Sequence, residues 1–382
     1  MNIGITCYPS VGGSGILASA LGEELALRGH EIHFISYERP FRLPVDAPKL
    51  HFHPVEVTSY GLFKYPDYTL PLSVKMAEVS VQHRLDVLHV HYAVPHATAA
   101  ILARSMLPPD IQPRVVTTLH GTDTTLLGAD PGYGPAIRHA LAASDAITTV
   151  SAYLERETRR LLRLEQTIHI IHNFFEPHSP QRSPAEVRKE LGLDGEVVVL
   201  HASNLRPLKR IDLLLQAVSQ VRVREKFKVL ILAGDSFASF APAARKLGIE
   251  DRLLVLEKVT QIEDYLQIAN LGFYTSETES FCLSILEGMC FGSPSVSTAV
   301  GGIPEVVEDG ISGVLVRSSE PTVLAQALEE LISDSARRAR LGLAARERAK
   351  ERFSARTIVP RYEALYRRVC QNRNKIAEAL KP

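Results

Sequence analysis

Two glutamates, Glu279 and Glu287, stand eight residues apart in the stretch ESFCLSILEGMCFGSPSVSTAVGGIPE. The segment SFCLSILEGM between them has the pattern of a helix start. If Glu279 lies at the mouth of a site and Glu287 inside the helix, a rise of ~1.5 Å per residue separates them by about 12 Å. That is roughly the distance between the two sugars of a nucleotide-diphosphate sugar. An amphipathic helix with two solvated glutamates explains the same spacing.

The first turn of this helix supplies a second kind of group. Backbone amides near Phe281, Cys282 and Leu283 have no partner inside the helix, and such amides favour a phosphate. The segment therefore predicts a binding site for a nucleotide-diphosphate sugar. In this site one carboxylate binds hexose hydroxyls, the amides bind phosphate and the other carboxylate binds ribose hydroxyls.

A basic loop, Asn204-Leu205-Arg206-Pro207-Leu208-Lys209-Arg210, lies between a predicted strand and a predicted helix. Cations beside a helix N-terminus oppose the helix dipole. They are explained if a diphosphate binds there, because arginine can grip it with two hydrogen bonds and lysine adds a point charge. A solvated basic loop is the alternative.

Polar residues also fall at the ends of predicted strands in the first half, namely Tyr92, Thr118, His120 and Asp123. Ligands of open parallel sheets bind beyond the carboxyl ends of the strands. His120 is open to three interpretations: a sugar contact, a core residue or a metal ligand. The metal is least favoured, because no partner stands at zinc spacing and the chain has no D-x-D motif.

The elements that position these residues alternate between strand and helix. NIGITC (2–7) predicts a buried strand, YPSVGGSG a glycine loop and ILASALGEELALRGH a helix ending at Gly29. That layout is typical of a phosphate or sugar cradle, although it lacks G-x-G-x-x-G and also fits a plain tight turn. Further strands are expected at 31–37, 86–92, 114–123, 145–151 and 168–177, and helices at 72–83, 96–107 and 134–143.

Residues 178–195, rich in Pro, Ser and charge, are predicted to be a linker. A second series of strands follows at 196–203, 228–236, 252–259 and 271–276, with helices at 211–223 and 265–269 and from Pro321 onward. The last helix, roughly 355–371, is long enough to return to the first half. The pattern predicts an α/β fold of two doubly wound, Rossmann-like parallel sheets facing each other across a cleft. The predicted domains are 1–175 with 355–382, and 176–354.

Composition narrows the class of protein. The chain has 382 residues, too many for one ordinary core, and its 43 basic residues balance 43 acidic ones. This balance gives no bulk attraction for nucleic acid or an anionic membrane. No apolar run has membrane-spanning length, the N-terminus begins with a strand instead of a basic leader, and the four cysteines lack metal spacing. We expect a cytoplasmic protein with reduced thiols, not stably inserted in a membrane.

Several of these motifs carry a family resemblance. The E-x7-E pair, the AGD turn at 233–235, the GGIPE turn at 301–305 and the basic loop with Lys209 resemble the retaining GT-B glycosyltransferases of family 4. Seven further segments cover nearly the whole chain: GITCYPSVGGSG, GHEIHFIS, PFRLP, KMAEV, DVLHVHYAVPHA, VVTTLHGTD and GGIPEVV. They are similar to the branch of that family that opens bacillithiol biosynthesis by transferring N-acetylglucosamine from UDP-N-acetylglucosamine to the hydroxyl of L-malate.

The resemblance implies roles for individual residues. Glu287 would bind the ribose hydroxyls, Glu279 and the amides after it the hexose, and the basic loop the diphosphate. The implied donor-binding residues are Gly13, Asn204, Arg206, Lys209, Glu279, Phe281, Cys282, Leu283 and Glu287. The implied catalytic residues are His120, Lys209, Arg206 and Glu279. Residues matched to the acceptor side are Ser14, Lys75, Tyr92, Thr118 and Arg138, which are the donors and cations that a small dianion requires.

The resemblance also implies the reaction. It is a displacement on the front face with retention, without a metal or another cofactor, in an enzyme that self-associates. Two alternatives stay open: a family 4 transferase with another acceptor, such as an inositol phosphate or a lipid, and a silent nucleotide-sugar-binding protein. The family usually has Gly where this chain has Cys282, and because only the amide is needed there, activity should survive if φ is negative. SFASF replaces a glycine-rich turn after Gly234 and Asp235.

Overall fold

The computed structural model describes residues 1–9, 13–40, 42–44, 47–57 and 67–379, with side chains up to Gln371. It divides the chain into two compact units, each described here by itself. Unit 1 comprises Met1–Asn173 together with Ala355–Pro382, and unit 2 comprises Phe174–Ser354. The first division falls two residues before the predicted boundary at 175, and the second coincides with the predicted one at 354.

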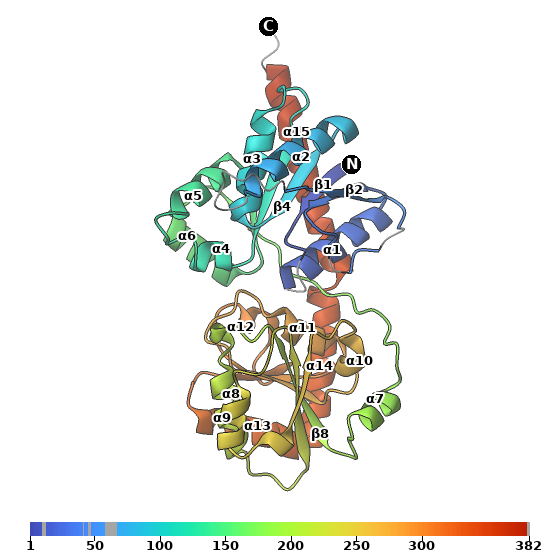
Figure 1. Ribbon diagram of the computed structural model, residues 1–382, viewed down its shortest axis with the longest axis vertical. Coiled ribbons are helices and arrows are strands. Elements are labelled where there is room, and N and C mark those ends of the chain that lie inside the picture. Colours follow the sequence, from blue (N-terminus) through green and yellow to red (C-terminus); the bar gives the residue numbers. More distant parts are fainter. Residues whose placement is uncertain (10–12, 41, 45–46, 58–66, 380–382) are drawn as a thin grey trace. The chain divides into compact units, whose positions relative to one another are not determined.

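Unit 1 is built on a parallel sheet that has seven strands among the described residues, in the order β3-β2-β1-β4-β5-β6-β7 (Figure 1). The strands are β1 Asn2–Thr6, β2 Glu31–Ser36, β3 Leu50–Pro54, β4 Val87–His91, β5 Arg114–Leu119, β6 Ala146–Thr149 and β7 Ile168–Ile170. The central strands are buried throughout, which is why they appear in the sequence as short apolar runs. Edge strand β3 is not among the elements that the sequence predicts.

Helices cover this sheet: α1 Gly13–Leu27, α2 Thr69–His83, α3 Thr98–Ser105, α4 Thr122–Thr125, α5 Gly134–Ala143 and α6 Ala152–Leu162, with a π-helical turn at Ala93–Ala97. Small residues of α3 pack with Leu72 and Met76 of α2 in one apolar cluster. Helix α6, which the sequence pattern does not predict, starts where the Ser151 hydroxyl accepts a hydrogen bond from the amide of Leu154.

The last helix, α15 (Ala355–Ala379), belongs to unit 1 and confirms the predicted return of the chain. Its Glu363 carboxylate lies 2.9 Å from Nε2 of His30, next to the start of β2. The Tyr366 hydroxyl lies 2.7 Å from Nδ1 of His89 in β4, and both side chains are fully buried. The helix therefore completes the core of a unit whose other elements all lie before residue 174.

Unit 2 contains a second parallel sheet, which has six strands among the described residues, in the order β10-β9-β8-β11-β12-β13. The strands are β8 Val197–Ser203, β9 Phe227–Ala233, β10 Leu253–Glu257, β11 Leu271–Tyr274, β12 Ser295–Thr298 and β13 Gly313–Val316. The α-helices are α7 Pro184–Glu190, α8 Ile211–Gln220, α9 Ala241–Lys246, α10 Glu263–Leu266, α11 Leu283–Cys290, α12 Ile303–Val306, α13 Pro321–Ser333 and α14 Ser335–Arg352. Single 3₁₀ turns occur at Pro207–Lys209 and Glu250–Arg252. The two sheets confirm the α/β class, while their facing each other across a cleft stays a prediction.

Two predicted strands are shorter than expected. The strand expected at 114–123 ends at Leu119, because Gly121 takes φ +123° and helix α4 begins at Thr122. The strand expected at 168–177 ends at Ile170, and the chain crosses into unit 2 soon afterwards. In both places an apolar or Thr-rich sequence continues beyond the last ladder hydrogen bond.

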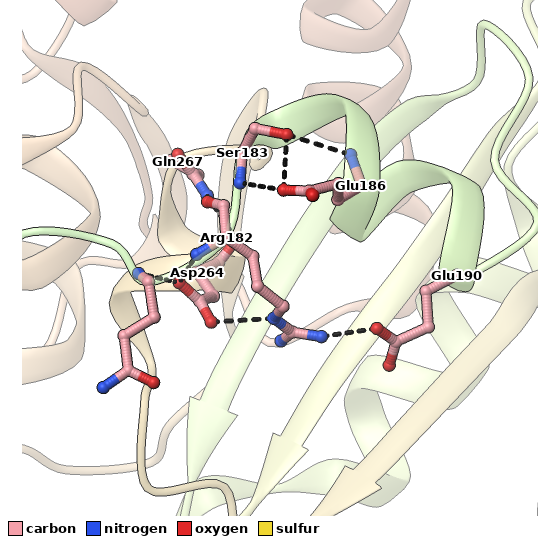
Figure 2. Close-up of polar contacts among 7 residues, drawn as sticks. Arg182, Ser183, Glu186, Glu190, Asp264 and Gln267 are labelled. Carbon is pink, nitrogen blue, oxygen red and sulfur yellow. Dashed lines mark hydrogen bonds and ion pairs between the residues drawn. The ribbon is translucent and has the colours of Figure 1, made fainter.

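The predicted linker at 178–195 is wrong in part, because it contains a helix anchored on unit 2 (Figure 2). Ser183 and Glu186 form a reciprocal capping box at the start of α7. The Asp264 carboxylate of α10 accepts hydrogen bonds from the amides of Gln181 and Arg182, and the Arg182 side chain bridges it to Glu190. The capping signal S-x-x-E was present in the sequence, but the Pro and Ser content around it favours a linker.

Candidate active site

Loops after three strands of unit 2 are joined to one another by hydrogen bonds. After β11, the Thr275 hydroxyl donates to the carbonyl oxygen of Arg210 at 3.0 Å. The amide of Glu277 donates to the carbonyl oxygen of Leu208 at 2.8 Å. After β12, the Thr298 hydroxyl donates to the carbonyl oxygen of Ser276 at 2.7 Å. The carboxyl ends of neighbouring parallel strands meet at one edge of the sheet, so the basic loop and the Glu279 segment lie together there.

Glu279 and Lys209 meet at this edge. The Lys209 Nζ lies 2.5 Å from Glu279 Oε1, which also accepts a hydrogen bond from the Ser276 hydroxyl at 2.8 Å. The Glu279 side chain is only 9% exposed and that of Lys209 18%. Burial alone would lower the pKa of Lys209, but the charge and hydrogen bond of Glu279 outweigh it and raise that pKa. The edge therefore holds a charged ammonium and a carboxylate acceptor next to each other.

The GGIPE turn fixes the backbone of this segment. The amide of Gly302 donates to the carbonyl oxygen of Glu279 at 2.8 Å. A Cβ on Gly301 would lie 2.0 Å from that oxygen, and one on Gly302 would lie 2.2 Å from the carbonyl oxygen of Ser280. Gly301 also has φ +59°. Glycine is required at both positions, because the backbone of this turn lies in close contact with that of the Glu279 segment.

Helix α11 begins at Leu283, later than the sequence pattern predicts. Glu279 therefore precedes the helix by four residues, and the separation of about 12 Å, which assumed helical rise over all eight residues, does not apply. Glu287 lies on the helix and is 5% exposed, so the alternative of two solvated glutamates is wrong.

Cys282 is the residue that precedes α11, and its backbone has φ +72° and ψ +74°. The condition of a negative φ is therefore not met: the chain has a left-handed conformation here, at a cost of about 1 kcal/mol for a residue with a side chain. Burial and the nearby Glu279 raise the pKa of the Cys282 thiol well above its ordinary value. The thiol stays protonated, and the amide keeps the orientation that a glycine would give it.

The rest of the basic loop borders a cavity of about 650 Å³ in unit 2. Arg206 is exposed on its wall, and Asp235 and Ser236 line it from the loop after β9. Gly234 approaches Asn204 so closely that a Cβ would lie 3.2 Å from its Cα. In the SFASF turn, Phe237 is buried in the apolar core and its amide donates to Glu257 at 2.7 Å, so the turn is held without glycines.

Unit 1 gathers a different set at the carboxyl edge of its own sheet. The Tyr92 hydroxyl donates to the Ser14 hydroxyl at 3.0 Å, and the Tyr92 ring lies 5.0 Å from that of His120, measured between centroids. Nδ1 of His91 lies 2.9 Å from Nε2 of His120. Burial and His96 lower the pKa of His120 to about 3, so its imidazole is uncharged at neutral pH. The structure thus brings Ser14, Tyr92 and His120 together.

Thr118 lies beneath this group. Its side chain is fully buried, and its hydroxyl lies 2.7 Å from Nε2 of His89 and 2.6 Å from the hydroxyl of Thr148. Its carbonyl oxygen accepts a hydrogen bond from the amide of Tyr92 at 2.9 Å. Thr118 therefore supports Tyr92 from within the sheet, and its role toward an acceptor stays a prediction.

Two further polar residues, to which sequence reasoning assigned no role, are fully buried beside these groups. The Asp123 carboxylate accepts from the amides of Ala93 and Gly121, and burial raises its pKa to about 6. His201 of β8 lies 2.8 Å from the carbonyl oxygen of Phe273 and 2.8 Å from the Ser203 hydroxyl. The position of Asp123 after a strand was a signal in the sequence, whereas no signal marks His201.

The remaining predicted residues lie as follows. Gly13 is the first residue of α1. Lys75 lies on α2, with its Nζ 2.6 Å from the Glu78 carboxylate one turn along the helix. Arg138 is exposed on α5. The structure shows no contact of Lys75 or Arg138 with Tyr92 among the hydrogen bonds and ion pairs of the described residues, and their roles stay predictions.

Comparison with known proteins gives the class. A family model described as "Glycosyltransferase Family 4" matches residues 11–179, and one described as "Glycosyl transferases group 1" matches residues 184–348. A curated relative is 42% identical over 369 residues, which cover 96% of this chain and 96% of the relative. The chain therefore belongs to glycosyltransferase family 4. That relative is the N-acetyl-alpha-D-glucosaminyl L-malate synthase of Bacillus anthracis.

More distant similarity agrees with this class. A D-inositol 3-phosphate glycosyltransferase of Xylanimonas cellulosilytica is 30% identical over 292 residues, which cover 70% of this chain and 68% of the relative. Among solved structures, sucrose-phosphate synthase from Thermosynechococcus elongatus has a TM-score of 0.78 at 20% identity, covering 97% of this chain and 99% of that one. HepE of Anabaena in complex with UDP-glucose has a TM-score of 0.75 at 18% identity, covering all of both chains. These structures show that the fold is GT-B.

The chain is thus a glycosyltransferase with the fold that the sequence predicts. No helix among the described residues has the length and apolar character needed to cross a membrane.

Proposed function

We propose that this protein transfers N-acetylglucosamine from UDP-N-acetylglucosamine to the hydroxyl of L-malate, with retention and without a metal, as the first step of bacillithiol biosynthesis. The observation that carries the proposal is the 42% identity, over 96% of both chains, with a relative whose name states that product. This identity extends over the first half of the chain, which we expect to determine the choice of acceptor.

The donor side of the proposal rests on the paired Lys209 and Glu279. Glu279 offers carboxylate oxygens to hexose hydroxyls, while Lys209 and Arg206 stabilise the negative charge that develops on the diphosphate as the bond breaks. Glu287, buried on α11, is assigned to the ribose hydroxyls. The complex of HepE with UDP-glucose supports a UDP-sugar as the donor class for this fold.

The chemical step that we propose is a displacement on one face of the sugar. The bond from the anomeric carbon to the diphosphate oxygen breaks, and the bond to the malate hydroxyl oxygen forms on the same face. The hydroxyl proton passes to the leaving phosphate oxygen, so UDP departs and the α configuration is kept. Catalysis then comes mainly from positioning and charge stabilisation, and no carboxylate acts as a covalent nucleophile, unlike in the two-carboxylate glycosidases.

His120 is assigned a place beside the hexose. Its low pKa leaves an uncharged ring that can donate or accept a hydrogen bond. Ser14 and Tyr92, which are hydrogen-bonded to each other, offer hydroxyls to the small acceptor. Lys75 and Arg138 are the cations assigned to the malate carboxylates.

Replacing Arg138 tests the malate assignment. Arg138→Ala should raise the KM for malate about tenfold or more and leave that for UDP-N-acetylglucosamine nearly unchanged, because one charge-assisted hydrogen bond is lost. Arg160→Ala, an exposed arginine on α6, is the matched control and should change neither. Steady-state rates at varied malate measure the effect. An unchanged malate dependence in the Arg138 variant would remove this residue from the pocket.

The absence of a D-x-D motif supports a metal-independent step, in which Lys209 and Arg206 supply the charge that a divalent ion would otherwise provide. Initial rates should therefore be the same in excess EDTA and in added Mg²⁺. A rate that falls in EDTA and returns with Mg²⁺ would contradict this part of the proposal.

The relatives named D-inositol 3-phosphate glycosyltransferase favour one rival, transfer to an inositol phosphate. The deciding experiment incubates the purified chain with UDP-N-acetylglucosamine and a panel of hydroxy acids and inositol phosphates, followed by mass spectrometry. We expect one product, of the mass of N-acetylglucosaminyl malate, with an α linkage by the anomeric proton coupling in NMR. A product only with inositol phosphate would establish the rival, and no product with any acceptor would favour a silent binding protein.

A further inference from the structure

Three histidines from different elements of unit 1 converge outside the site described above. His33 lies on β2, His53 on β3 and His83 on the last turn of α2. One ring nitrogen from each can be chosen so that all three lie within 4.8 Å of one another. Nδ1 of His33 and Nε2 of His53 are 3.0 Å apart. We call these three residues the histidine cluster.

We propose that the histidine cluster is a binding site for one divalent transition-metal ion, Zn²⁺ by preference, held by His33, His53 and His83. Imidazole nitrogen is a preferred ligand of Zn²⁺, and three histidines with an open fourth position are an established ligand set. Mg²⁺ and Ca²⁺, which prefer oxygen ligands, do not fit this set.

The distances suit such an ion. Zn–N bonds of about 2.0–2.1 Å in a tetrahedral arrangement place the ligand nitrogens about 3.4 Å apart. The observed upper separation of 4.8 Å requires shifts of about an ångström, which rotation of the rings supplies. His33 is 3% exposed, whereas His53 and His83 are half-buried. The buried residue thus fixes the site while the other two can turn toward an ion that enters from solvent.

The charges around the cluster are compatible with a cation. On β3, His51 stacks on His33 and lies 3.1 Å from the Glu31 carboxylate of β2. On α2, Lys75 and Glu78 form an ion pair with each other and act on His53 with opposite signs. Each of the three imidazoles can offer an uncharged ring nitrogen, the form that binds a metal.

The position of the cluster indicates a structural role. His33 lies in the middle of β2 and His53 near the carboxyl end of β3, whereas the carbonyl oxygen of His83 accepts a hydrogen bond from the Asn2 side chain at the start of β1. β3 is the edge strand of the sheet. A bound ion would therefore tie the edge strand to β2 and to α2.

The test measures binding of Zn²⁺ to the full chain. After chelation and dialysis, titration calorimetry with Zn²⁺ should give one equivalent bound and a higher melting temperature, whereas Mg²⁺ should give neither. Co²⁺ as a substitute should give the visible absorption of a tetrahedral site with nitrogen ligands. If neither ion binds stoichiometrically, the proposal is overturned.

Two variants locate the site. His53→Ala and His83→Ala each remove a half-buried ligand and should weaken Zn²⁺ binding roughly tenfold or more. His51→Ala, which changes a stacked neighbour outside the cluster, is the matched control and should bind Zn²⁺ like the unchanged chain. Unaltered affinity in both ligand variants would show that the ion binds elsewhere and overturn the assignment. The Co²⁺ spectrum of the unchanged chain remains decisive if either variant fails to fold.

Discussion

The two units hold their candidate residues by different means. In unit 2, contacts to the main chain fix the site: the carbonyl oxygens of the loops after β8 and β11 accept hydrogen bonds from the loops after β11 and β12, and the turn at Gly301 and Gly302 packs against the carbonyl oxygens of the Glu279 segment. In unit 1, side chains fix the site: Tyr366, His89, Thr118 and Thr148 form a buried chain of hydrogen bonds beneath Tyr92.

This difference determines which kind of substitution should destabilise each unit. A site fixed through main-chain contacts tolerates no added Cβ at its glycines, because the interfering atoms are backbone and cannot move aside. A side-chain network tolerates backbone variation but loses stability with each buried polar partner that is removed, since its neighbour is left without a hydrogen bond. The predictions below test this contrast in order of expected effect.

Lys209→Ala should have the largest effect on activity. It removes the positive charge next to the departing diphosphate, and turnover should fall by about 10²–10³-fold, as for the loss of one charge-stabilising group in a preorganised site. The folded state should persist, because the surrounding loops are held by hydrogen bonds in which the Lys209 side chain takes no part. Steady-state rates together with circular dichroism measure both quantities. Turnover like that of the unchanged chain would remove the assigned role.

Gly301→Ala should have the largest effect on stability. Its Cβ would lie 2.0 Å from the Glu279 carbonyl oxygen, so the free energy of unfolding should fall by about 3 kcal/mol or more. Gly310→Ala is the matched control. Gly310 also has a positive φ, +73°, but a Cβ there meets nothing within 4 Å, so the free energy of unfolding should fall by only about 1 kcal/mol. Urea unfolding distinguishes them. Equal losses in the two variants would show that the close contact is unimportant.

Tyr366→Phe probes the side-chain network of unit 1. Removing the hydroxyl leaves Nδ1 of buried His89 without its partner, which should cost about 1–2 kcal/mol. Tyr133→Phe, at an exposed site on the same unit, should cost nearly nothing. Thermal unfolding measures the difference. If the two variants melt alike, the network does not contribute to stability and the contrast between the units fails.

Cys282→Gly should have the smallest effect. Glycine relieves the strain of φ +72° but loses the packing of a buried side chain, and the two contributions, each about 1 kcal/mol, nearly cancel. Turnover should stay within about twofold, because the amide keeps its direction. A large rise or fall in turnover would show that the thiol itself takes part in donor binding.

The sequence predicted the fold well because central parallel strands are buried on both faces and leave short apolar runs between helices. The meeting of Lys209 and Glu279 was also predictable, since both follow strands whose carboxyl ends share one edge of a sheet. The late start of α11 was not predictable: Cys282 has a left-handed backbone conformation, which local pattern does not predict for a residue with a side chain.

Contacts between distant segments could not be found from local pattern. His89 and Tyr366 are 277 positions apart, and no periodicity connects them. The histidine cluster combines residues of β2, β3 and α2, and its spacing is far from that of a zinc motif within one loop. In both cases the sheet topology brings the partners together, and that topology is known only once the strand order is known.

The return of α15 has a consequence for biosynthesis. Helix α15 packs against α1 and β5 and buries Ile358, Val359 and Tyr362 in unit 1, so a growing chain that ends at residue 173 lacks part of that core. Unit 2 is continuous in sequence and is synthesised in full before α15. We therefore expect residues 1–173, although they are made first, to complete their core only after α15 has been made, so the first unit does not fold as an independent N-terminal domain.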